Sequence, residues 1–359
     1  MKEKHWIYIV SLFTGGSFLL LMISNLIIDP FNIFHTGVLK YQVQQNERYQ
    51  KIEFLKHHKN KFDTLMLGNS RIGTTDPVIL EQYLPDGKVY NMGVSSANTD
   101  DYLKHLKYFI KDGYSLKTIY LQIDYQDMMY WGHSDSNYLQ KYHPDVTDQN
   151  MFVYFWKYLT ITPVFNMKIK LLQNITPDNS HTVHDFEGTG MWFNDKKESA
   201  INRDPEAYIK QEASFHLKLD RTTGINPPAY KKMLKSMREL TVLCDRHNIR
   251  LILFTAPLNH TFLDSFYIED MLTFLEDISR IHNYWFFSDY NSLTCNNSNY
   301  YEASHYRDTL AKSIAARIFQ DNTANLPDDF GLYIQQNQFK QYREQIRENL
   351  TKACSHIRP

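Results

Sequence analysis

A long apolar run near the amino terminus constrains this chain more than any other feature. Residues 6–28 carry no charged side chain and are mostly apolar. As a helix with a rise of about 1.5 Å per residue, the run reaches roughly 34 Å, enough to cross a hydrocarbon core of about 30 Å. A cleaved signal peptide has a shorter apolar region and a small-residue cleavage site, for which only poor candidates exist here. We therefore predict an uncleaved signal anchor; the alternative is a buried core helix.

The charges on either side of this run predict its orientation. Lys2 and Lys4 precede it, and the next lysine or arginine after it is Lys40. Because positively charged flanks remain on the cytoplasmic side, residues 1–28 are expected to hold a cytoplasmic amino terminus and a single transmembrane anchor. The rest of the chain is then expected in the periplasm or outside the cell.

The composition excludes several classes of function. A formal net charge of −1 over 359 residues gives no basic surface for nucleic acid. No glycine-rich phosphate loop is present, so no nucleotide is expected, and we predict no cofactor. The three cysteines, Cys244, Cys295 and Cys354, are odd in number and far apart, which predicts neither a disulfide framework nor a zinc site.

Short apolar runs alternate with amphipathic segments through much of the chain. Strands are predicted at about residues 64–67, 88–92, 117–123, 250–255 and 284–287, and helices at about 77–83, 99–111, 229–248, 262–282 and 306–319. Strand–helix alternation of this kind is typical of a parallel sheet with right-handed crossovers. The prediction is an α/β fold with helices on both faces of the sheet, three layers in all.

The regularity of this pattern suggests domain limits. Residues 29–59 are expected to connect the anchor to an α/β domain at 60–320, and 321–359 to form a polar tail with a helix near its end. Within the domain, residues 125–226 lose the pattern and are rich in aromatic residues. We predict that this insertion forms a cap or one wall of a groove; the alternative is that its rings pack a small core of their own.

The first strand ends in Gly68-Asn69-Ser70, which places a serine just beyond its carboxyl end. Open α/β sheets bind their ligands at this edge. The glycine lets the backbone turn sharply and leaves the Ser70 hydroxyl exposed, as a nucleophile requires. The alternative is that Ser70 is only the N-cap of a helix at residues 75–84.

A second polar motif, Glu302-Ala303-Ser304-His305, precedes the last predicted helix. A carboxylate three residues before a histidine is able to fix the tautomer of the imidazole while the other ring nitrogen faces a nucleophile. His305 would then act as the general base for Ser70.

Taken together, these motifs resemble those of the SGNH (GDSL-like) hydrolase superfamily, over about residues 60–124 and 245–320. The resemblance implies a flavodoxin-like α/β/α fold with Ser70 as nucleophile, His305 as general base and Glu302 as its orienting acid.

The same resemblance implies an oxyanion hole. Gly93, in the Tyr-Asn-Met-Gly segment after the second strand, matches the glycine of the family's second block. Its backbone N–H, together with that of Ser70, would donate to the oxyanion.

The chain departs from the family pattern in its polar residues. Asn69 stands where the better-known enzymes have Asp, and Glu302 stands where Asp is usual, which leaves Asp289 and Asp308 as alternative partners for His305.

The third block, Gly-x-Asn-Asp, is absent, because the corresponding strand ends Gln122-Ile123-Asp124. Asn98 or Arg71 is the candidate for the missing oxyanion donor. Arg71 has an alternative role as a surface cation.

A histidine pair in the insertion does not predict a metal. His181 and His184, next to Asp185, have no third ligand at a useful spacing.

Finer features resemble membrane-anchored, extracytoplasmic branches of the superfamily, such as alginate O-acetyltransferases and the D-alanyl lipoteichoic-acid transfer protein. These features are the single anchor, the Asp29-Pro30-Phe31 exit, the Gly-Asn-Ser-Arg form and the strand at residues 251–257. The resemblance implies a serine esterase or O-acyltransferase that acts on an acylated glycan through an acyl-serine, with a polytopic membrane acyltransferase as partner if it transfers. The alternatives are a catalytically weak glycan-binding scaffold of a polysaccharide assembly and, third, a lipid esterase or thioesterase.

Overall fold

The computed structural model describes residues 2–42, 45–129, 137–177, 183–352 and 354. The chain forms two compact units: Met1–His57 with His133–Thr182, and His58–Gly132 with Val183–Pro359. The predicted insertion at residues 125–226 is thus divided between the two units.

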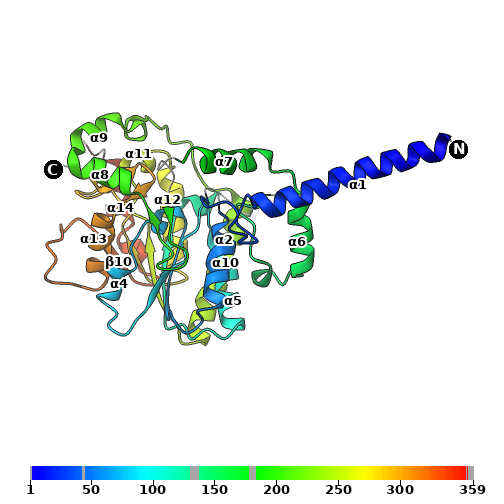
Figure 1. Cartoon of the computed structure of the whole chain (residues 1–359). Coiled ribbons are helices and arrows are strands. Elements are labelled where there is room, and N and C mark those ends of the chain that lie inside the picture. Colours follow the sequence, from blue (N-terminus) through cyan, green and yellow to red (C-terminus); the bar gives the residue numbers. More distant parts are fainter. Residues whose placement is uncertain (1, 43–44, 130–136, 178–182, 353, 355–359) are drawn as a thin grey trace. The chain divides into compact units, whose positions relative to one another are not determined.

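The second unit is built on a six-stranded sheet (Figure 1), in the order β10-β7-β6-β3-β1-β2. The strands are β1 (Thr64–Leu67), β2 (Val89–Asn91), β3 (Thr118–Ile123), β6 (Arg250–Thr255), β7 (Tyr284–Phe286) and β10 (Leu332–Ile334). Five strands are parallel, which confirms the prediction of an α/β fold with a mostly parallel central sheet. The sixth, β10, runs antiparallel to β7 and was not predicted.

Helices flank this sheet (Figure 1), with α5 and α10 opposite α4 and α13. The longer helices of the unit are α5 (Thr99–Lys111), α8 (Asp195–Arg203), α9 (Pro205–Gln211), α10 (Pro227–Arg246), α12 (Ile268–Ser279), α13 (Asp308–Ile318) and α14 (Arg343–Thr351). The short ones are α3 (Ser70–Gly73), α4 (Val78–Glu81) and α11 (His260–Leu263). The helix predicted at 262–282 is therefore two helices, α11 and α12.

The core explains why the central strands are apolar without alternation. Every residue of β1 and β3 is buried, as expected for parallel strands covered on both faces. Met66, Tyr120 and Phe254 share one buried cluster with Leu310 and Ile314 of α13. The apolar residues that are spaced four apart along α13 therefore face the sheet.

Two small hairpins belong to the same unit. β4 (Val183–His184) pairs antiparallel with β5 (Trp192–Phe193), and β8 (Tyr300–Glu302) pairs antiparallel with β9 (His305–Tyr306). Short 3-10 helices complete it: η1 (Tyr125–Met128), η3 (Ala213–His216), η4 (Asn297–Asn299) and η5 (Phe339–Gln341).

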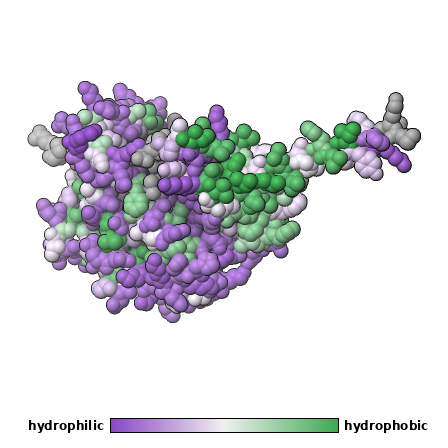
Figure 2. Space-filling view, viewed as in Figure 1, coloured by the Kyte–Doolittle hydropathy of each residue, from purple (hydrophilic) through white to green (hydrophobic). Residues whose placement is uncertain are grey.

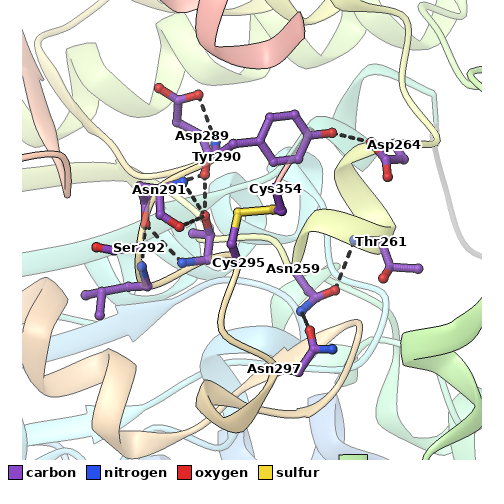
Figure 3. The surroundings of a disulfide bond; sticks show 12 residues. Asn259, Thr261, Asp264, Asp289, Tyr290, Asn291, Ser292, Cys295, Asn297 and Cys354 are labelled. Atoms are coloured by element: carbon purple, nitrogen blue, oxygen red, sulfur yellow. Dashed lines mark hydrogen bonds between the residues drawn. A yellow bond between two sulfur atoms is a disulfide. The ribbon is translucent and has the colours of Figure 1, made fainter. Parts of the chain in front are cut away.

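The carboxyl-terminal tail is bound to this unit in three ways. It adds β10 to the sheet, α14 packs against α12, and Cys354 forms a disulfide with Cys295. Figure 3 shows this disulfide beside the loop that follows β7. The prediction that the cysteines form no disulfide was wrong, because the pairing depends on the tail folding back over 59 residues of chain.

The first unit contains α1 (Lys2–Ile28), α2 (Glu47–Lys56), η2 (Pro144–Val146), α6 (Met151–Leu159) and α7 (Val164–Ile175). Among the described residues, Lys4–Ile28 is the one helix long and apolar enough to cross a membrane, and its most apolar part is not buried at all. This exposure argues against the core-helix alternative. Some aromatic residues of the predicted insertion, Tyr138, Tyr154 and Tyr158, pack into a small buried cluster with Phe31 and Tyr49.

Candidate functional site

Ser70 is the first residue of α3, immediately beyond the carboxyl end of β1. A Cβ on Gly68 would lie 2.8 Å from Cγ2 of Ile72, so the turn between strand and helix leaves no room for a side chain there. The N-cap is Asn69, whose Oδ1 accepts the backbone N–H of Arg71 at 3.0 Å. The alternative that Ser70 is an N-cap is therefore wrong, and its half-buried side chain is not used as a cap.

Glu302 and His305 face each other across the β8–β9 hairpin, where they are register partners. Nδ1 of His305 is hydrogen-bonded to Oε1 of Glu302. Oε2 of Glu302 accepts Nζ of Lys197, on α8, at 2.6 Å. Burial favours the neutral carboxyl, but the hydrogen bonds and charges of His305 and Lys197 outweigh it and hold the pKa of Glu302 below its usual range.

The other ring nitrogen of His305 is available. Nε2 is buried and has no hydrogen-bond partner among the described residues. The ring of Trp192, from β5, lies beside the imidazole with 6.4 Å between ring centroids. If Nδ1 carries the ring proton, Nε2 is a hydrogen-bond acceptor that is shielded from water, and a hydroxyl brought to it would be able to donate to it.

The structure brings the serine helix and the histidine strand together. Helix α3 lies against β9, and Oγ1 of Thr74, just after α3, donates to the carbonyl of Tyr306 at 3.3 Å. Because Nε2 of His305 is unpartnered, the hydrogen bond from Ser70 that a triad uses is not formed here. Catalytic hydrogen bonds are often long in ligand-free enzymes and tighten with substrate.

A buried polar chain connects the same elements. The hydroxyl of Tyr306 donates to Oε1 of Gln122 at 2.7 Å, Nε2 of Gln122 donates to Oδ1 of Asn69 at 3.3 Å, and Nδ2 of Asn69 donates to Oδ2 of Asp124 at 3.3 Å. These hydrogen bonds connect β9, through the end of β3, to the turn before Ser70. Sequence reasoning did not assign a role to Gln122, although it stands in the strand where the third block is missing.

Arg71 is buried, so its interpretation as a surface cation was wrong. Its side chain is 3% exposed, and Nη1 contacts Oδ2 of Asp124 at 2.5 Å and Oε1 of Gln126 at 3.1 Å. The guanidinium lies 4.8 Å from the ring centroid of Phe262. One donor, Nε, has no partner among the described residues.

The two other predicted oxyanion donors differ in availability. The N–H of Gly93 donates to Oδ1 of Asn91 at 2.9 Å, so it is already engaged. Asn98 is the N-cap of α5, where its Oδ1 accepts the N–H of Asp100, but its Nδ2 is buried and has no partner in the described part of the chain. The assignment of an oxyanion hole to these residues stays a prediction.

Of the three acids considered for His305, Glu302 is the one bonded to it. Asp289 accepts the N–H of Tyr290 at 2.8 Å and Nδ2 of Asn349 at 3.0 Å, and burial raises its pKa to about 7. Asp308 accepts the N–H of Asp76 at 3.2 Å, and burial raises its pKa to about 6.

The histidine pair of the insertion is only partly described, because His181 lies outside the described residues. His184 stacks on Phe186 with ring centroids 5.0 Å apart, and Oδ2 of Asp185 accepts from Thr189. Within the described ranges, no group of three or more His, Cys, Asp or Glu side chains is arranged to hold a metal ion.

Comparison with known proteins identifies no family. No protein-family model matches the chain, and a search of curated proteins finds no significant match. The resemblance to the SGNH superfamily therefore stands on the motifs described above.

Proposed function

We propose that the chain is a membrane-anchored, extracytoplasmic serine esterase or O-acyltransferase with an SGNH-type α/β domain. One observation carries the proposal: Glu302 holds Nδ1 of His305, Nε2 has no partner among the described residues, and the strand that bears His305 lies against the helix beginning at Ser70. Acyl transfer to serine requires an acid that orients a base and a base that reaches the nucleophile; the pairing of Glu302 with His305 supplies the first, and we propose that substrate binding brings Ser70 to His305.

In the proposed reaction, Oγ of Ser70 attacks the carbonyl carbon of an ester while Nε2 of His305 takes the hydroxyl proton. The tetrahedral intermediate collapses, the ester C–O bond breaks, and His305 returns the proton to the departing alcohol. Water or a sugar hydroxyl then attacks the acyl-serine by the same steps in reverse. The first acceptor gives hydrolysis and the second gives transfer.

We expect the oxyanion to accept hydrogen bonds from donors that have no other partner. Nδ2 of Asn98 and Nε of Arg71 are buried donors without partners among the described residues, whereas the N–H of Gly93 would have to leave Asn91. Loss of one such donor typically lowers the rate by about 10²–10³.

The disulfide supports an extracytoplasmic location. Disulfides persist in oxidising compartments and are rare in the cytosol, and Cys295–Cys354 lies in the unit that follows the anchor. The acylated cell-surface or exported polysaccharide, and a polytopic acyltransferase as acyl donor, are proposed from the resemblance alone.

Labelling of the full-length protein by a fluorophosphonate, which traps activated serines, tests the proposal. We expect labelling of the wild type, loss of labelling in Ser70→Ala, and unchanged labelling in the control Ser313→Ala, a half-buried serine of α13. Labelling that persists in Ser70→Ala would remove Ser70 from the reaction.

The engaged N–H of Gly93 favours a second candidate, a catalytically weak glycan-binding scaffold. A wild type that resists the probe but retains acylated polysaccharide in a pull-down would support the scaffold.

A further inference from the structure

The first unit exposes an apolar surface on two consecutive helices. Figure 2 shows hydrophobic residues gathered around the base of α1. The most exposed of them on α6 and α7 are Phe152 (73%), Trp156 (47%), Val164 (70%), Phe165 (69%), Leu172 (49%) and Ile175 (74%). We call these six residues the α6–α7 surface. Contiguous apolar surfaces of this kind mark contact sites rather than ordinary protein surface.

Helix α7 has the reverse of the side-chain distribution expected for a helix that faces water. Its buried residues are polar: Lys170 is 2% exposed and Gln173 is 7% exposed. Nζ of Lys170 donates to the carbonyl of Asp29 at 2.5 Å. On the opposite side, Val164 and Ile175 share one outward face at helical spacing. Polar groups directed inward and apolar groups directed outward suit an apolar surrounding medium.

Helix α6 follows the same rule. Tyr158 is fully buried, its hydroxyl donates to Oδ1 of Asp29 at 2.8 Å, and it accepts the N–H of Phe31 at 3.1 Å. Phe152 and Trp156 point the other way and are exposed. The hydrogen bonds of Tyr158 and Asp29 in the interior of this unit therefore do not involve Phe152 or Trp156.

The α6–α7 surface continues the exposed surface of α1. Nδ2 of Asn25, near the end of α1, donates to the carbonyls of Leu159 and Ile161 at 2.8 and 2.7 Å. Phe18 lies beside Trp156, with 6.3 Å between ring centroids. A groove of about 430 Å³ between α1 and α7 is lined by apolar residues such as Ile28 and Leu172.

The length of α1 sets the depth of these contacts. The apolar helix Lys4–Ile28 is about 38 Å long at about 1.5 Å per residue, against a hydrocarbon core of about 30 Å. Asn25 therefore lies where the helix leaves the bilayer, and so do Leu159 and Ile161, whose carbonyls it binds at the end of α6 and just before α7. Aromatic side chains are enriched at that level, and the exposed Lys157 and Lys168 would reach the headgroups.

We propose that α6 and α7 lie in the lipid interface of the bilayer that α1 spans, with the α6–α7 surface inserted among the acyl chains. The occupant of this surface is lipid, bound as amphipathic interfacial helices bind it. The inference rests on α1 being a membrane span and is independent of the chemistry of Ser70.

Depth-dependent quenching tests the proposal on the full-length protein in nanodiscs of phosphatidylcholine and phosphatidylglycerol in equal parts. Phe165→Cys and Leu172→Cys are labelled separately with bimane; Cys244 is buried and the other two cysteines form the disulfide. Leu20→Cys in α1 is the membrane-embedded control. Val242→Cys on α10, 52% exposed, is the matched control for an exposed apolar position.

We expect a lipid carrying a nitroxide near the top of its acyl chain to quench bimane at 165 and 172 almost as strongly as at 20, and several-fold more than at 242. Aqueous iodide should give the reverse order. Quenching of 165 and 172 by iodide, with no effect of the nitroxide lipid, would overturn the proposal. Protection from both quenchers would also overturn it and would indicate that protein covers the surface.

Discussion

The two ring nitrogens of His305 are in different environments, and this difference defines its proposed role. Nδ1 is bonded to Glu302, so in neutral imidazole this nitrogen carries the proton and Nε2 is the acceptor. Lys197 holds the second oxygen of the carboxylate and so restricts its rotation. The acid therefore acts on Ser70 only through His305, whose orientation, tautomer and imidazolium form it stabilises.

Replacing Glu302 by Gln tests this arrangement. An amide in place of the carboxylate cannot stabilise the imidazolium, and we expect fluorophosphonate labelling to slow by about 10²–10⁴. Because the pKa of Glu302 is lowered, the carboxylate persists below the ordinary titration range of a glutamate and is lost only as pH falls through the lowered value. Wild-type labelling should therefore keep the contribution of this carboxylate to a lower pH than an unpaired glutamate would allow.

The matched comparison is Lys197→Met. Lys197 is half exposed, so its loss should change the labelling rate far less than Glu302→Gln does. Equal effects of the two substitutions would mean that the carboxylate has no special role at His305.

Asp289 gives a pH-dependent prediction about stability. Burial raises its pKa in the folded chain to about 7, above the ordinary value near 4, so between these pH values the folded state binds more protons than the unfolded state. Stability then falls as pH rises from about 4 to about 7. Asp289→Asn should flatten this decline by on the order of 3 kcal/mol. Urea unfolding of the two proteins across this pH range checks it, and parallel curves would contradict it.

At the scale of elements, helix α3 packs closely against the β4–β5 hairpin because Gly73 has no side chain. A Cβ on Gly73 would lie 2.9 Å from the ring of Trp192. Gly73→Ala should therefore destabilise the protein by about 1–3 kcal/mol, the usual cost of overpacking.

Removing the indole of Trp192 separates the steric effect of Gly73→Ala from its effect on helix propensity. Gly73→Ala should cost clearly less in a Trp192→Ala background, with a coupling energy of about 0.5–3 kcal/mol in a double-mutant cycle measured by urea unfolding. Simple additivity would show that Trp192 does not restrict α3.

The elements that sequence reasoning found are those whose signal is local. Helix α5 and strand β6 were predicted to the residue, because one has a clear apolar face and the other a continuous apolar run. Strand β10 was missed because it has only three residues, and pairing with β7 rather than its own pattern makes it a strand. The buried pair Arg71–Asp124 was missed for the same reason, since it depends on β1 and β3 lying side by side.

The tail that carries β10 also carries a testable crosslink. The disulfide closes a loop of 59 residues, for which the chain-entropy estimate is about 4 kcal/mol and typical measurements give 2–4 kcal/mol. We expect the double variant Cys295→Ser, Cys354→Ser to lose about that much stability to urea. Addition of reductant should lower the wild type to the same level and leave the double variant unchanged. Equal stability of wild type and variant would show that β10 and α14 hold the tail without the crosslink.

At the scale of the whole molecule, two independent features point to the same side of the membrane. Lys2 and Lys4 favour a cytoplasmic amino terminus, and the Cys295–Cys354 disulfide favours an oxidising compartment for the other end. A single span between them satisfies both, whereas the opposite orientation would place the disulfide in the cytosol. The expected topology is therefore amino terminus inside, α1 across the membrane, and the second unit with the rest of the first outside.

An impermeant maleimide applied to spheroplasts measures this topology directly. Val242→Cys on α10 is exposed and should react in intact spheroplasts, while His5→Cys, at the start of α1, should react only after lysis. The wild type is the blank, because Cys244 is buried and the other two cysteines are oxidised. The reverse pattern would place the Ser70 site in the cytoplasm. An exported polysaccharide could then not be its substrate, even if Ser70 reacts with the fluorophosphonate, so labelling and topology together decide whether the proposed chemistry occurs where the proposed substrate lies.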